Sequence, residues 1–267
     1  AGVTGCRIID SPRERLIAIL TNSFVPCNGR FPTLMAMILI FFIPAASPVR
    51  TLAAGAVLTG FILLGIIVTL LMSKLLSSTI LKGIPSSFIL ELPPYRVPKA
   101  GSVIIRSIRD RTVFVLGRAI AVAAPFGIVI WILANIKIGS VSILDHCTDF
   151  LDPFGRLIGV DGVIVMAFIL GFPANEIVIP VMLMSYMSSG VLTDYSSLSQ
   201  LQDILAGCGW TFRTALCVAI LCLFHFPCGT TCLTVKKETG SLKWTACAFL
   251  LPTLTGIMLC MVINILF

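Results

Sequence analysis

The chain has 267 residues, of which 57% are hydrophobic and only 12% are charged, and its mean hydropathy is +1.05. An ordinary soluble domain carries about 25% charged residues, so this chain has too few charges to cover a soluble surface. We therefore predict an all-α, multi-pass helical membrane protein. The net charge of +7 arises from basic residues between the apolar segments, which indicates membrane topology and not nucleic-acid binding.

Most of the ten cysteines lie inside apolar segments, where they are typical of small buried residues or soft metal ligands. Cys147 and Cys208 fall in segments that we expect on the outer side, so a disulfide between these two is one alternative. The chain begins at Ala1 without an initiator methionine or a signal peptide, and we expect it to be part of a longer protein.

Residues 1–73 are predicted to form a broken helix followed by two spans. A helix over residues 12–24 meets a polar break at residues 26–32 (PCNGRFP), where two prolines withdraw backbone donors. A short span over 32–46 follows. The apolar segment 49–73 is long enough to cross a hydrocarbon core of about 30 Å.

Residues 74–118 differ in character, because they carry eight basic residues against Glu91 and Asp110. The excess of basic residues places this segment on the cytoplasmic side. Within it we predict an extended elbow at residues 92–95 and an amphipathic helix on the membrane surface at 102–111.

Residues 119–267 complete the single membrane domain, and a span over 112–136 leads into them. Residues 137–161 carry four aspartates and are predicted to be an outer loop. The span over 213–233 is interrupted at residues 225–229 (HFPCG). A basic loop over 234–243 precedes the final span, 244–267.

The segment 162–188 contains the most informative stretch, residues 171–180 (GFPANEIVIP). Glu176 is the only carboxylate or cationic side chain between Val163 and Met187, and a charge at membrane depth costs about 3 kcal/mol. Two prolines and a glycine predict a helix break there. The segment either crosses the membrane or folds back as a re-entrant hairpin; loop charge favours the hairpin, which keeps the basic loop 234–243 inside.

The three breaks together offer sulfur, imidazole, carboxylate and amide groups, the donors that a borderline divalent transition metal prefers. The candidate metal-site residues are Cys27, Asn175, Glu176, His225 and Cys228. Each of them has a structural alternative: a carboxyl that stabilises the break, an amide that caps a half-helix, or buried packing. The chain contains no phosphate-binding loop and no spaced Ser, His and Asp set, so we predict neither an enzyme nor a bound cofactor.

Several motifs in this order resemble the membrane domain of the FeoB ferrous iron transporters, over nearly the whole chain. The motifs are residues 9–16 (IDSPRERL) with 26–32 as a first gate, 91–98 (ELPPYRVP) as the elbow, 171–176 (GFPANE) as a second gate, and 226–228 (FPC) with 235–244 (VKKETGSLKW). The resemblance implies ferrous iron transport across the cytoplasmic (inner) membrane, regulated by GTP on an N-terminal domain that this chain lacks. It also implies that Cys27, Glu176 and Cys228 line the metal path, with Asn175 in support.

The sequence analysis therefore predicts the permease part of a ferrous iron transporter, with ferrous iron, membrane lipid and the GTPase domain as partners and a homo-oligomer left open. One alternative is a carrier of nucleosides or other solutes, because an Asn-Glu pair at a helix break can bind hydroxyls and bases. Another is a membrane scaffold that transports nothing. The choice among iron, manganese and zinc is open.

Overall fold

The computed structural model describes residues 2–44, 48–83, 101, 104–105, 108 and 113–267. The predicted elbow at 92–95 lies outside the described residues, as does most of the predicted surface helix at 102–111. The described part is almost entirely helical, with one two-stranded hairpin. Its elements are α1 (Gly2–Gly5), η1 (Cys6–Ile8), α2 (Pro12–Thr21), η2 (Asn22–Phe24), η3 (Asn28–Arg30), α3 (Phe31–Met37), η4 (Ile38–Phe42), α4 (Arg50–Ser78), α6 (Phe114–Asn135), β1 (Lys137–Ile138), β2 (Val141–Ser142), α7 (Ile143–Leu157), α8 (Gly162–Leu170), η6 (Asn175–Ile177), α9 (Val178–Tyr186), α10 (Leu198–Gly207), α11 (Phe212–Phe224), α12 (Gly229–Thr239) and α13 (Leu242–Leu266).

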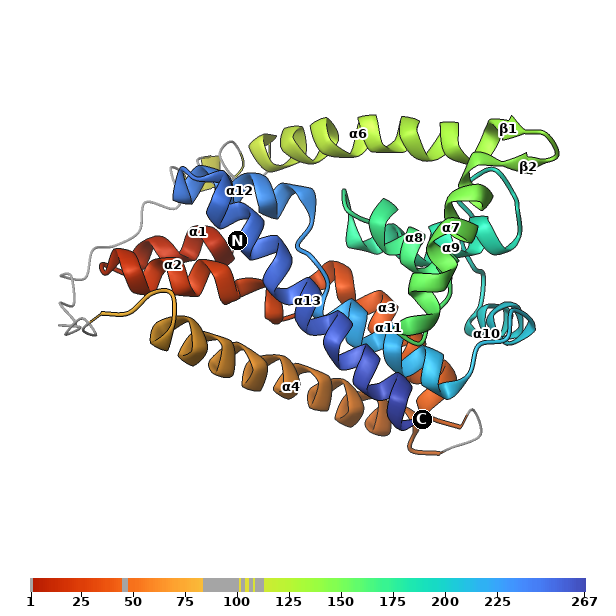
Figure 1. Cartoon of the computed structure of the whole chain (residues 1–267), viewed down its shortest axis with the longest axis horizontal. Coiled ribbons are helices and arrows are strands. Elements are labelled where there is room, and N and C mark those ends of the chain that lie inside the picture. Colours follow the sequence, from red (N-terminus) through yellow and green to blue (C-terminus); the bar gives the residue numbers. More distant parts are fainter. Residues whose placement is uncertain (1, 45–47, 84–100, 102–103, 106–107, 109–112) are drawn as a thin grey trace.

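Four stretches of the described chain are long and apolar enough to cross a membrane, which confirms the predicted polytopic α-helical class. Two of them are single helices, α4 and α13. The other two are interrupted: Pro12–Phe42 contains the break between α2 and α3, and Phe212–Thr239 contains the break between α11 and α12. Figure 1 shows α4 along one edge of the molecule and α6 along the opposite edge, with α11 and α13 between them.

The prediction of a loop over residues 137–161 is wrong in its secondary structure, because most of this segment forms the helix α7. The side chain of Ser142 caps its first turn by accepting a hydrogen bond from the backbone N–H of Asp145. Asp145, Asp149 and Asp152 are spaced by four and three residues, so they share one helical face. Helical periodicity was thus present in the sequence, and the high acid content concealed it.

The segment 162–188 folds back on itself, as the favoured alternative predicted. Helices α8 and α9 each have nine residues and pack against one another. The hydroxyl of Tyr186 at the end of α9 donates a hydrogen bond to the carboxylate of Asp161, which caps the start of α8. The Trp210 indole N–H in turn donates to the Tyr186 oxygen. The base of this hairpin is therefore closed by a polar chain of three side chains.

Close helix approaches depend on two glycines. A Cβ atom on Gly65 of α4 would lie 2.8 Å from the carbonyl oxygen of Phe24, at the first break. A Cβ atom on Gly162 would lie 2.0 Å from the carbonyl oxygen of Thr148, where α7 and α8 meet at an angle of 108°. Only glycine allows these backbones to touch.

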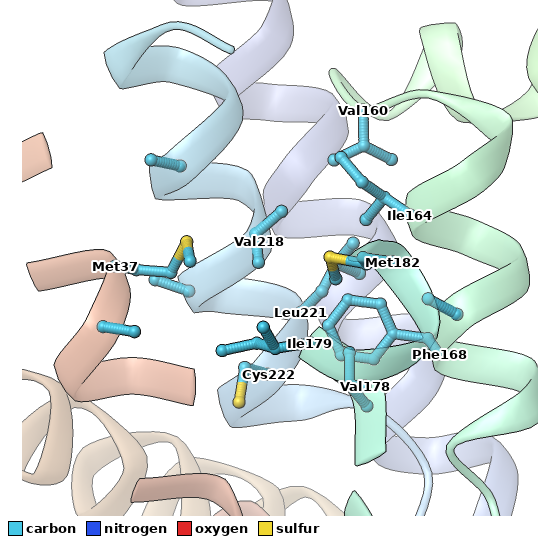
Figure 2. Packing of buried hydrophobic residues seen from close by; sticks show 14 of the residues in the cluster. Met37, Val160, Ile164, Phe168, Val178, Ile179, Met182, Val218, Leu221 and Cys222 are labelled. Carbon is cyan, nitrogen blue, oxygen red and sulfur yellow. The ribbon is translucent and has the colours of Figure 1, made fainter. Parts of the chain in front are cut away.

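One apolar core joins α3, the α8–α9 hairpin and α11, as Figure 2 shows for Met37, Phe168, Met182 and Val218. Met166, Met182 and Met184 are buried, which agrees with a packing role.

Cys147 and Cys208 are free thiols, so the alternative of a disulfide between them is wrong.

Candidate metal site at three helix breaks

The three helix breaks meet inside the molecule. The side chain of Glu176, at the second break, lies directly against Gly29 of the first break: a Cβ atom on Gly29 would be 3.3 Å from Cγ of Glu176. The second and third breaks are joined through the backbone, because the N–H of Gly229 donates to the carbonyl of Phe172 at 2.8 Å. The chain thus places residues from three distant sequence segments around one point.

Arg30 ties the first break to the third. Its side chain is 2% exposed, and Nη1 donates to the carbonyls of Ser23 and Leu223, both at 2.9 Å. Nη2 donates to the carbonyls of His225 at 3.0 Å and Phe226 at 3.3 Å. A helix break leaves carbonyls without intrahelical partners, and the planar guanidinium supplies several donors at fixed angles. Arg30 therefore satisfies both broken ends with one buried cation.

Asn175 connects all three breaks through its side chain. Its Nδ2 donates to Cys27 Sγ at 3.7 Å, and its Oδ1 lies 3.2 Å from Nε2 of His225. Cys27 is exposed, whereas Asn175 and His225 are buried. The structure thus brings three of the five predicted site residues into one hydrogen-bonded chain.

The protonation of this chain follows from His225. Its Nδ1 lies 3.0 Å from the carbonyls of both Leu221 and Cys222, so Nδ1 carries a proton. A backbone carbonyl bonded to one ring nitrogen is also the usual way to orient a histidine whose other nitrogen binds a metal.

Two arrangements of the Asn175 amide then satisfy its neighbours. With Oδ1 toward His225, Nε2 would have to carry a second proton, which is unfavourable for a buried ring beside the Arg30 cation. With the amide turned over, Oδ1 accepts the proton of the Cys27 thiol and Nδ2 donates to a neutral imidazole. The second arrangement leaves the imidazole neutral.

Glu176 and Cys228 stand apart from that chain. Glu176 is exposed and lies beside Gly29. Cys228 begins α12, and its sulfur lies 3.1 Å and 3.2 Å from the hydroxyls of Thr230 and Thr231. Among the described residues, no three His, Cys, Asp or Glu side chains are close enough to hold a metal ion together. The described arrangement therefore offers single donors around a shared point and no closed cage.

Comparison with known proteins supplies the family. Residues 58–109 match the family described as the C terminus of ferrous iron transport protein B, and residues 116–242 match the Gate family, described as nucleoside recognition. The Fe(2+) transporter FeoB of Staphylococcus aureus (strain MSSA476) is 30% identical over 96% of this chain. The Fe(2+) transporter FeoB of Leptospira interrogans (strain Fiocruz L1-130) is 26% identical over 94%.

The chain belongs to the FeoB family. It spans 37% of the length of the staphylococcal relative and 39% of that of the leptospiral one. No solved structure matches the chain.

The sequence analysis did not identify Arg30 or Gly29 as residues of the candidate site. Arg30 stands inside the quoted motif at residues 26–32, but the sequence analysis gave it no role. The signal was the absence of any acid nearby in the sequence, together with two adjacent helix breaks that leave carbonyls unpaired. The thiols of Cys27, Cys222 and Cys228 are all close enough to interact electrostatically with the guanidinium.

Proposed function

We propose that this chain is the ferrous-iron permeation part of a GTP-regulated FeoB transporter in the cytoplasmic membrane. One observation carries the proposal: Asn175 bridges Cys27 and His225, so that a sulfur and an imidazole nitrogen face each other across a buried amide. Sulfur and imidazole ligands suit ferrous iron better than magnesium or calcium.

Iron enters past the acidic outer face and meets Cys27 and Glu176, the two exposed donors on either side of Gly29. A thiol binds metal as the thiolate, so its S–H bond breaks as the S–Fe bond forms. The proton passes to water at this exposed thiol, and the Asn175 amide stays within hydrogen-bond reach of the sulfur. A site with few protein ligands both binds and releases its ion, as transport requires.

The test is uptake of radioactive ferrous ion under anaerobic, reducing conditions into vesicles that contain the full-length protein. We expect Cys27→Ser and Glu176→Gln to lower the flux at least tenfold, the size of effect that loss of one good metal interaction produces. Cys228→Ser tests the third predicted ligand. Cys208→Ser is the matched control, because this exposed thiol at the end of α10 is remote from the breaks and its loss leaves the flux unchanged.

A nucleoside carrier is the second candidate, favoured by the description of the Gate family that residues 116–242 match. A nucleoside would bind the Asn175 amide and the Glu176 carboxylate by hydrogen bonds and would not need sulfur. The same vesicles with labelled uridine distinguish the two. Uridine uptake that survives Cys27→Ser, with no iron flux in the unmodified protein, overturns the iron proposal. If the iron flux stays at background in both the unmodified protein and Glu176→Gln, the result supports the scaffold alternative.

A further inference from the structure

A cavity lies beside the second and third helix breaks, between α6 and α12. It has a volume of about 410 Å³ and is lined mainly by apolar side chains. Figure 1 shows α12 beside the first turns of α6. The α12 residues that line it are Gly229, Cys232, Leu233 and Lys236, which are spaced by three, one and three residues and so form one face of the helix.

The cavity has one apolar end and one charged end. At the apolar end the two helices touch, because a Cβ atom on Gly229 would lie 2.9 Å from Val122 of α6 and 3.0 Å from the ring of Phe172. At the other end lies Lys236, seven residues further along α12, which corresponds to about 10 Å along the helix axis. The lining therefore fits an amphiphile with a negatively charged head.

The charges around the open end favour an anionic head. Lys236 and Lys237 occupy the last turn of α12, and Lys243 the first turn of α13. The nearby carboxylate of Glu238 is already held by Arg7, whose Nε and Nη2 donate to it at 2.8 and 2.7 Å. Among the described residues, the Lys236 ammonium group has neither an ion pair nor a hydrogen bond, and the side chain is exposed.

The surroundings of the cavity indicate a lipid as its source. The α6 helix that forms one wall exposes large apolar side chains elsewhere on its surface, including Ile120, Ile128 and Trp131. Such a surface belongs in the acyl region of a bilayer. Basic residues at a helix end attract anionic phospholipids, each contributing about 1 kcal/mol near the membrane surface.

We propose that the groove between α6 and α12 binds one anionic phospholipid, with an acyl chain along Leu233, Phe126 and Phe172 and the phosphate at Lys236. This proposal goes beyond ion transport and does not depend on it. Because Phe172 belongs to the second break and Gly229 to the third, the bound lipid contacts both interrupted segments.

The experiment measures lipid retained by the full-length protein in native mass spectrometry, after reconstitution with equal amounts of phosphatidylglycerol and phosphatidylcholine. We expect one phosphatidylglycerol to be retained selectively. Lys236→Gln should weaken its retention about fivefold, the factor that one basic residue contributes near an anionic surface. Lys237→Gln is the matched control, because it removes the same charge one residue away from the cavity lining and should change retention less than twofold.

A second pair of variants tests the acyl site. Leu233→Trp fills the cavity and should abolish selective retention, whereas Leu254→Trp places the same ring on the exposed face of α13 and should not. The proposal is overturned if the two lipids are retained equally, if Lys237→Gln acts as strongly as Lys236→Gln, or if no lipid is retained because another part of the protein covers the groove.

Discussion

The first and third helix breaks are held together very differently from the second. Arg30 joins the first and third with four hydrogen bonds from a buried cation. The second break contacts them through one backbone hydrogen bond, from Gly229 to Phe172, through the neutral side chain of Asn175, and by packing of Phe172 on Phe226 and of Glu176 on Gly29. We infer that the two interrupted spans joined by Arg30 form a fixed frame, against which the tip of the α8–α9 hairpin packs without a charged hydrogen bond.

The base of the hairpin, in contrast to its tip, is firmly attached. Asp161, Tyr186 and Trp210 form a connected set of hydrogen bonds there. The base of the hairpin is thus anchored by hydrogen bonds between side chains, whereas its tip is held by the Asn175 amide and by packing of Phe172 against Phe226. Substitutions at the breaks, at the hairpin base and at an exposed ion pair should therefore differ in their effects.

The largest effect is expected from Arg30→Met. It removes four charge-assisted hydrogen bonds and leaves buried carbonyls without donors, so unfolding should become easier by about 3 kcal/mol or more. Thermal unfolding in detergent measures the loss, and Arg30→Lys should recover part of it. Arg156→Met is the control, because that exposed side chain pairs only with Asp152. Equal stability of Arg30→Met and Arg156→Met would contradict the fixed frame.

Tyr186→Phe should have the next largest effect. It removes the hydroxyl that donates to Asp161 and accepts from Trp210, and should cost about 1 to 2 kcal/mol. The measurement is again thermal unfolding. Tyr195→Phe is suited as a control, because Tyr195 lies in the loop before α10, outside this set of hydrogen bonds. If the two variants lost the same stability, the hairpin base would not be the anchor that we infer.

Gly29→Ala should change stability by less than about 1 kcal/mol but affect metal binding more. The added methyl would contact Cγ and Oε1 of Glu176 at 3.3 and 3.4 Å, and this exposed side chain can move aside at little cost. Displacing Glu176 should weaken ferrous-ion binding several-fold, measured by anaerobic equilibrium dialysis. Gly55→Ala in α4 meets nothing within 4 Å and is the control. Unchanged metal affinity would argue against a role for Glu176 in binding.

Arg7→Ala should have the smallest effect, although its ion pair with Glu238 is bidentate and short. The Arg7 side chain is 58% exposed, and solvent screening leaves such exposed pairs with little net contribution to stability. The loss should diminish further in high salt, which thermal unfolding at two salt concentrations can check. A loss as large as that of Arg30→Met would show that exposure is a poor guide to the importance of cations in this protein.

Sequence patterns were sufficient for the apolar spans, and structure changed their limits by only a few residues. The predicted span 49–73 is the helix Arg50–Ser78, and the predicted span 244–267 is Leu242–Leu266. Both are runs of apolar residues without interruption, in which local composition dominates. The predicted loop at 234–243 was less accurate, because α12 continues to Thr239 and the turn is confined to the neighbourhood of Gly240, whose φ of 64° suits glycine.

The candidate site was only partly accessible from sequence. Prolines and isolated polar residues located all three breaks, and Cys27, Asn175 and His225 do meet. The role of Cys228 as a ligand stays a prediction, since its sulfur is described among threonine hydroxyls. The role of Glu176 is likewise still predicted, because its carboxylate lies beside Gly29 without a second ligand.

The amino-acid sequence by itself determined that this chain is a helical membrane protein with three interrupted segments, because hydropathy and proline positions act over short distances along the chain. Only the tertiary structure decided that Arg30 satisfies carbonyls almost two hundred residues away, and that Asn175 stands between a thiol and an imidazole. Hydrogen bonds between distant segments depend on how helices pack, and no local pattern encodes that packing.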